Sequence, residues 1–71
     1  MRVVELTREP IALYQLLKFE GLTTSGGEAK AVIAAGQVKV NGAVETQKRK
    51  KIVSGDVIEF GDAQLQLKLV E

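Results

Sequence analysis

The pattern of apolar and polar positions divides the chain into a helical first half and a strand-rich second half. Apolar residues first recur at helical spacing at Leu13, Leu16 and Leu17. This spacing predicts a helix over about residues 9–19, with Thr7 as a candidate cap before it and Gly21 as the residue that ends it. The β-branched stretch at residues 2–6 predicts a short strand in front of this helix.

A capping motif predicts the second helix. Ser25 and Glu28 stand three residues apart, the spacing of a capping box, in which each side chain bonds the backbone amide of the other residue. An apolar stripe follows at Ala29, Val32 and Ile33. With Gly36 as the stop signal, we expect a helix over residues 26–35. The short segment around Gly21 then joins two helices into a unit that resembles a helix–turn–helix.

After Gly36 the hydrophobic period changes from helical to two. Valines alternate with polar residues over 38–40, and Asn41-Gly42, a strong hairpin signal, precedes a return strand at 43–44. Residues 57–60 and 63–70 predict further strands, the last with inward leucines at Leu65, Leu67 and Leu69. The sequence therefore predicts an α+β fold, with two helices packed on a small, mostly antiparallel, twisted sheet.

The composition limits the chemistry that this chain can perform. Its 71 residues fit one domain and include no Cys and no His, which excludes disulfides, thiolate or imidazole metal sites and imidazole catalysis. No apolar run reaches the ~20 residues that span a bilayer, and no signal-peptide core is present. Asp56 and Asp62 each follow a glycine, where Asp typically bonds the backbone of a turn. We expect a cytoplasmic binding module, without catalytic residues, cofactor or metal.

The charges are distributed unevenly along the chain. Residues 30–51 carry six cations against one carboxylate, a net charge of +5, and the remaining residues carry −4. The six cations are Lys30, Lys39, Lys48, Arg49, Lys50 and Lys51. Such a field suits the docking of one face on a polyanion. The alternative is that the run at 48–51 is only a solvated lysine cluster.

The start of the second helix is a candidate anion site. Ser25, Gly26 and Gly27 place backbone N–H groups at the positive end of the helix dipole, without side chains that block their approach. Lys30 follows Gly26 by four residues and therefore lies on the same helix face. If Glu28 folds back onto these amides, however, the glycines serve only to ease a tight turn.

The hairpin adds three candidates. Lys39 points away from the flanking valines and is expected to be exposed, while Asn41 and Gly42 either contact a ligand or only form the turn. No aromatic residue interrupts the basic run, since the chain has only Tyr14, Phe19 and Phe60. A base-stacking platform is therefore disfavoured, and recognition of phosphates and of the shape of folded RNA is favoured.

Several of these segments together resemble the RNA-binding domain of small-subunit ribosomal protein S-four. They are Gly21-Leu22, Ser25, Glu28-Ala29-Lys30, Val32-Ile33, Gly36, Val38-Lys39-Val40-Asn41-Gly42 and Gly55-Asp56 with Val57-Ile58. The same domain occurs in pseudouridine synthases, tyrosyl-tRNA synthetases and a heat-shock ribosome-associated protein. The resemblance covers about residues 10–60 of a single domain over 1–71, with 1–6 and 61–71 as additional strands.

The resemblance is greatest to small stand-alone bacterial members and implies a two-helix αL motif in a cytoplasmic, monomeric protein. It implies a non-catalytic role in binding structured RNA, rRNA or tRNA, in association with the ribosome. The residues that it assigns to RNA are Ser25, Gly26, Gly27, Lys30, Lys39, Asn41 and Gly42. Gly26 stands where many relatives have a cation, so the run Lys48-Arg49-Lys50-Lys51 is expected to carry more of the contact. All these cations are expected to converge on one positive surface.

A second class of function stays open at this point. Small α+β domains also serve in protein interaction or as ubiquitin-like carriers, without binding nucleic acid. Such carriers need a C-terminal Gly-Gly, whereas this sequence ends in Leu69-Val70-Glu71, which disfavours that role.

Overall fold

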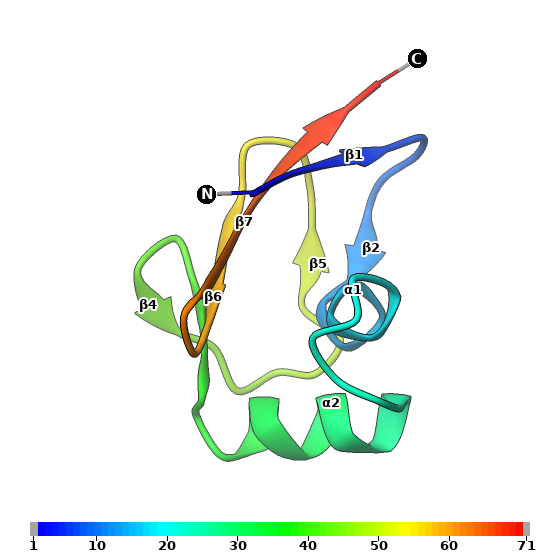
Figure 1. The fold of residues 1–71 in the computed structure, drawn as a ribbon. Helices are drawn as coiled ribbons and strands as arrows, with labels where there is room; N and C mark the ends of the chain where they lie inside the picture. Colours follow the sequence, from blue (N-terminus) through cyan, green and yellow to red (C-terminus); the bar gives the residue numbers. More distant parts are fainter. Residues whose placement is uncertain (1, 71) are drawn as a thin grey trace.

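The computed structural model describes residues 2–70, which form two helices and seven strands (Figure 1). In chain order they are β1 (Arg2–Leu6), β2 (Ile11–Ala12), α1 (Leu13–Phe19), α2 (Gly26–Ala34), β3 (Val38–Val40), β4 (Ala43–Val44), β5 (Lys51–Ile52), β6 (Val57–Phe60) and β7 (Ala63–Leu69). Figure 1 looks nearly along the axis of α1, with α2 running across the lower end of the molecule. The predicted α+β fold is confirmed.

Five of the strands form one sheet in the order β1-β7-β6-β3-β4. Only β1 and β7 are parallel among these neighbours, with Val4 opposite Leu67, and the other pairs are antiparallel. Strands β2 and β5 form a separate two-stranded sheet, in which Ile11 pairs with Ile52. The sheet is therefore mostly antiparallel, as predicted, and strands from the two ends of the described chain lie side by side.

The core lies between the helices and one face of the five-stranded sheet. The helices contribute Leu13, Leu16, Leu17, Ala29 and Ile33, and the strands contribute Val4, Leu6, Val38, Val40, Ile52, Ile58, Leu65 and Leu67. The strand residues alternate with exposed neighbours, because successive side chains point to opposite faces of a sheet. One sheet face is thus covered by helices, and the other carries polar side chains together with the exposed Val3.

The first helix begins later than the sequence pattern predicted. Ala12 precedes α1 with extended backbone angles (φ −71°, ψ 140°), and Ile11–Ala12 pair with β5 instead of forming a helical turn. The Glu9 carboxylate accepts a hydrogen bond from the Ser54 amide at 2.7 Å, so it belongs to a tertiary contact and not to a first helical turn. The predicted start near residue 9 and the predicted cap at Thr7 are therefore wrong.

The second helix follows the prediction closely. Ser25 caps it by accepting the Glu28 amide at 3.1 Å, and the helix ends at Ala34, one residue earlier than expected. The reciprocal half of the capping box is displaced by one residue, because the Glu28 carboxylate accepts from the Thr24 amide and hydroxyl at 3.3 and 3.0 Å. Gly36, at φ +77°, takes the left-handed conformation that ends the helix.

Candidate nucleic-acid interface

Tyr14, in the first turn of α1, contacts the face of α2 that carries two of the predicted residues. The Lys30 Nζ lies 4.7 Å from the centroid of the Tyr14 ring, which is within the range of a cation–π contact. A Cβ added at Gly26 would lie 3.9 Å from Cδ2 of the same ring. The ring thus packs along the first turn of α2 and holds the Lys30 ammonium beside that turn.

The basic segment, residues 48–51, is attached to the start of α1. No side chain caps this helix, and its first amides bond the carbonyls of the basic segment instead: Leu13 N–H donates to Lys50 and Tyr14 N–H donates to Lys48, each at 3.0 Å. Carbonyls from outside the helix thereby satisfy amides that have no partner within it. The four cationic side chains stay exposed, on a backbone that is fixed to the helix.

The start of α2 is open toward solvent. The Glu28 and Ala29 amides donate to Ser25, whereas those of Gly26 and Gly27 bond no other residue within the described chain. The Glu28 carboxylate is turned back to Thr24 and does not cover them. Its negative charge still lies at this helix end, so the attraction for an anion must come from the nearby cations.

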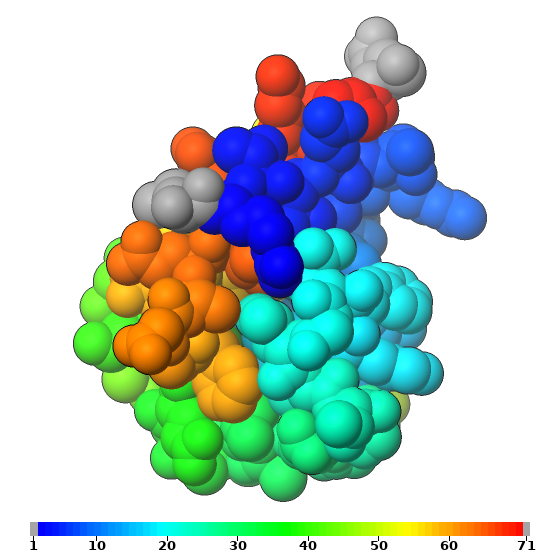
Figure 2. All heavy atoms as spheres, viewed as in Figure 1, coloured from blue at the N-terminus to red at the C-terminus, as the bar shows by residue number. Residues whose placement is uncertain are grey.

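We call the surface formed by Lys30 and residues 48–51 the basic face. Among residues 2–70 the only ion pair is Arg2–Glu20, at 3.7 Å, and none of the five cations of the basic face has a carboxylate within 4 Å. In the view of Figure 2, the yellow-green stretch that contains the basic segment is almost entirely hidden behind the rest of the molecule. Within residues 2–70, the charges of these five cations are thus not paired with carboxylates.

Lys39 does not join this surface. Val38 and Val40 point into the core that the helices cover, so Lys39, between them, points to the opposite face of the sheet. There it lies opposite Glu59 of β6 in the register of the sheet. The expectation that all the cations converge is therefore wrong for Lys39, and strand alternation is the reason.

The Asn41 side chain is engaged within the protein. Its Oδ1 accepts from the Val57 amide at 2.8 Å, and its Nδ2 donates to Asp56 Oδ1 at 3.0 Å. Asn41 and Gly42 both have positive φ, +52° and +85°, as the predicted two-residue hairpin turn requires. These contacts and angles explain Asn41 and Gly42 as turn residues. Asp56 also accepts a hydrogen bond from the Val53 amide, which is the backbone-bonding role expected of it.

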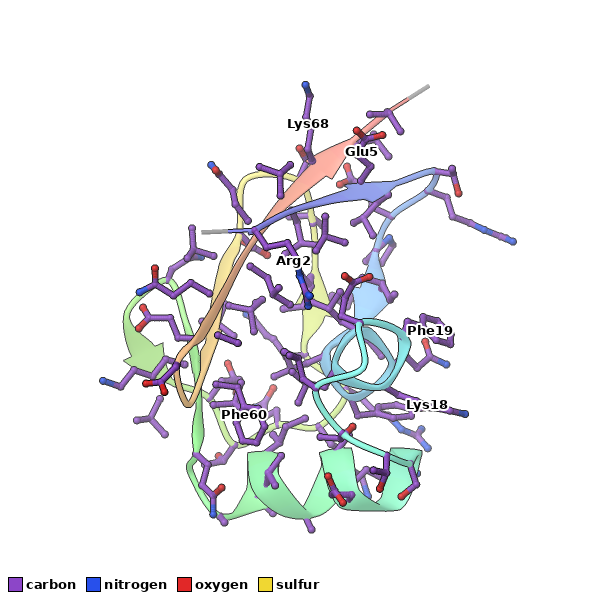
Figure 3. The ribbon with its side chains drawn as sticks, viewed as in Figure 1. Arg2, Glu5, Lys18, Phe19, Phe60 and Lys68 are labelled. Carbon is purple, nitrogen blue, oxygen red and sulfur yellow. The ribbon has the colours of Figure 1, made fainter. Side chains whose placement is uncertain are left out.

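Sequence reasoning missed two residues of this region. From the sequence, Tyr14 is only one of three aromatic residues. No local pattern indicates that the packing of α1 on α2 brings it to Lys30. Lys18 follows Tyr14 by four residues and so shares its side of α1, a spacing that could have been recognised. In Figure 3 the Lys18 and Phe19 side chains both extend to the right of α1, with Lys18 the nearer of the two to α2.

Other kinds of site find no support in the described part of the chain. Residues 2–70 contain no cluster of three or more acidic side chains that could hold a metal ion. Neither helix is long and apolar enough to cross a membrane. A hollow lies between β1 and α1, lined by the exposed Phe19 and Pro10 together with Glu20, and no residue of the basic face lines it.

The α+β fold, the αL-like helix pair and the exposed cationic segment together point to one family of domains. The S4 domain family matches residues 4–68, and the chain belongs to this family. The resemblance inferred from the sequence is thereby confirmed.

Two curated relatives cover nearly the whole chain. YbcJ from Escherichia coli (strain K12) and YbcJ from Shigella flexneri are each 48% identical to it over 68 residues, which is 94% of this chain and 97% of theirs. The solution structure of Escherichia coli YbcJ superposes with a TM-score of 0.72 over 96% of this chain and 87% of that one. That structure is described as revealing an αL motif involved in RNA-binding.

Proposed function

We propose that this protein binds structured RNA without catalysing a reaction, and that the basic face makes the contact. The observation that carries the proposal is that Lys30 lies on the Tyr14 ring beside the open start of α2, while the backbone of the exposed cationic segment 48–51 is fixed to the first amides of the same helix α1. Membership of the S4 domain family and the RNA-binding motif described for YbcJ support it. The RNA that we propose is rRNA or tRNA, bound by a cytoplasmic monomer in which residues 1–71 act as one domain.

Phosphate recognition follows from the chemistry of the surface. Lys30 and residues 48–51 neutralise phosphates, and the Gly26 and Gly27 amides fix the position of one phosphate at the start of α2. The Tyr14 ring already contacts Lys30, and the exposed Phe19 lies outside the basic face. The surface therefore lacks an aromatic platform for unpaired bases, which favours folded RNA over unstructured single strands.

The salt dependence of binding tests this proposal. Neutralisation of about five phosphates predicts a slope of log K against log salt concentration of roughly −3.5 to −4.5. Fluorescence anisotropy with labelled rRNA and tRNA hairpins over a potassium chloride series measures this slope. A single-stranded oligouridine of equal length is the control and is expected to bind more weakly.

A flat salt dependence would contradict the proposal. So would equal affinity for the hairpins and the oligouridine. A protein partner captured from cell extract equally well with and without ribonuclease treatment would instead support the protein-interaction function.

Gly26 is the position at which a new cation is expected to strengthen binding. A Cβ there would meet only the Tyr14 ring, at ordinary contact distances of 3.9 and 4.0 Å, so the position accepts a Cβ without a clash. Gly26→Arg is expected to tighten hairpin binding several-fold and to steepen the salt slope by about 0.7–0.9, the value for one added phosphate contact. Gly26→Ala adds the same Cβ without charge, so an equal gain from Gly26→Ala would show that helix stability is the cause.

A further inference from the structure

Tyr14 is linked to each part of the basic face. Its ring lies 4.7 Å from the Lys30 Nζ and packs against Gly26, and its backbone amide donates to the Lys48 carbonyl. The ring is partly buried against the core, whereas its hydroxyl makes no hydrogen bond within residues 2–70. The contact with Lys30 is therefore made by the ring and does not need the hydroxyl.

Contact with the Tyr14 ring restricts the flexible Lys30 side chain before RNA binds. An exposed lysine populates many rotamers, and fixing it on a phosphate costs conformational entropy. The negative face of the Tyr14 ring favours rotamers in which the Lys30 ammonium lies beside the first turn of α2. The ammonium hydrogens that point away from the ring remain available to a phosphate, because the ring attracts the charge without consuming all three donors.

We propose that Tyr14 is a positioning residue for RNA binding, whose ring holds the Lys30 ammonium where it meets an RNA phosphate. The inference rests on the proposed function of the basic face and adds to it a residue that carries no charge. Tyr14 acts through Lys30, so its contribution disappears when Lys30 is removed.

Binding measurements on variants of Tyr14 and Lys30 test this inference. Tyr14→Leu is expected to weaken hairpin binding about two- to fivefold, the range for a cation–π contact at a partly exposed site. Tyr14→Phe keeps the ring and is expected to bind like the wild type. Tyr14→Leu combined with Lys30→Ala is expected to bind no more weakly than Lys30→Ala alone. Tyr14→Met, a flexible apolar replacement, substitutes for Tyr14→Leu if that variant loses its far-ultraviolet circular dichroism spectrum.

An NMR measurement without RNA provides a second readout. The ring current of Tyr14 is expected to shift the Lys30 ε-methylene protons upfield in the wild type and in Tyr14→Phe, and this shift is expected to be lost in Tyr14→Leu. The positioning role is overturned if Tyr14→Leu loses the shift but binds the hairpin like the wild type, or if its effect adds fully to that of Lys30→Ala. If the wild type shows the shift but does not bind RNA, the proposed function itself fails.

Discussion

Reversal of two charges in the basic segment, Lys48→Glu with Lys50→Glu, is expected to weaken hairpin RNA binding between tenfold and a hundredfold. Each reversal replaces an attraction of about 1 kcal/mol at 4 Å in water by a repulsion of similar size, and physiological salt screens part of it. The fold is expected to persist, because both side chains are exposed and the contacts to α1 are made by backbone carbonyls. Anisotropy titrations and circular dichroism measure the two effects separately.

The chain offers a matched control for this variant. Arg8 lies in the loop between β1 and β2, and Lys68 lies on the exposed side of β7, far from α2 in Figure 3. Arg8→Glu with Lys68→Glu gives the same formal net charge as the test variant, −3, since each reversal lowers the native +1 by two. Equal loss of affinity in both variants would mean that net charge alone attracts the RNA, and the basic face would lose its special role.

The parts of the fold that the sequence predicted well depend on local signals. The Ser25 cap, the Asn41-Gly42 turn and the alternation along β7 are each determined by residues close together in the chain, and the structure shows all three. The position of Lys39 was predictable for the same reason. The alternation that buries Val38 and Val40 also turns Lys39 away from the helices, whereas the resemblance to RNA-binding relatives groups Lys39 with the other cations.

The parts that could not be predicted depend on contacts between distant residues. The start of α1 is set by the pairing of Ile11–Ala12 with Lys51–Ile52, and the contact of Tyr14 with Lys30 is set by how two helices pack. The same pairing brings the Lys48 and Lys50 carbonyls to the first amides of α1. One set of long-range contacts thus determines both where the helix begins and where the basic segment lies, whereas the contact of Tyr14 with Lys30 depends on the packing of α1 against α2.

Asn41→Ala is expected to lower the free energy of unfolding by about 2–3 kcal/mol. Asn41 has φ +52°, so alanine loses a side chain that tolerates the left-handed conformation, about 1–2 kcal/mol. It also loses the two exposed side-chain hydrogen bonds to Val57 and Asp56, together worth about 1 kcal/mol. For 71 residues the total stability is of order 4–10 kcal/mol. Urea unfolding followed by circular dichroism measures the loss, which would be a large fraction of that total.

Asn41→Gly separates the role of the turn from a role in RNA binding. Glycine accepts positive φ without strain, so only the side-chain bonds to Val57 and Asp56 are lost, and the expected destabilisation is about 1 kcal/mol. The affinity of the folded variant for the RNA hairpin is expected to stay within about twofold of that of the wild type. The reason is that the Asn41 side-chain amide bonds Val57 and Asp56 within the protein and is not part of the basic face. A tenfold loss of affinity with unchanged stability would show instead that Asn41 contacts the RNA directly, and the RNA-binding surface would then have to extend to the tip of the hairpin.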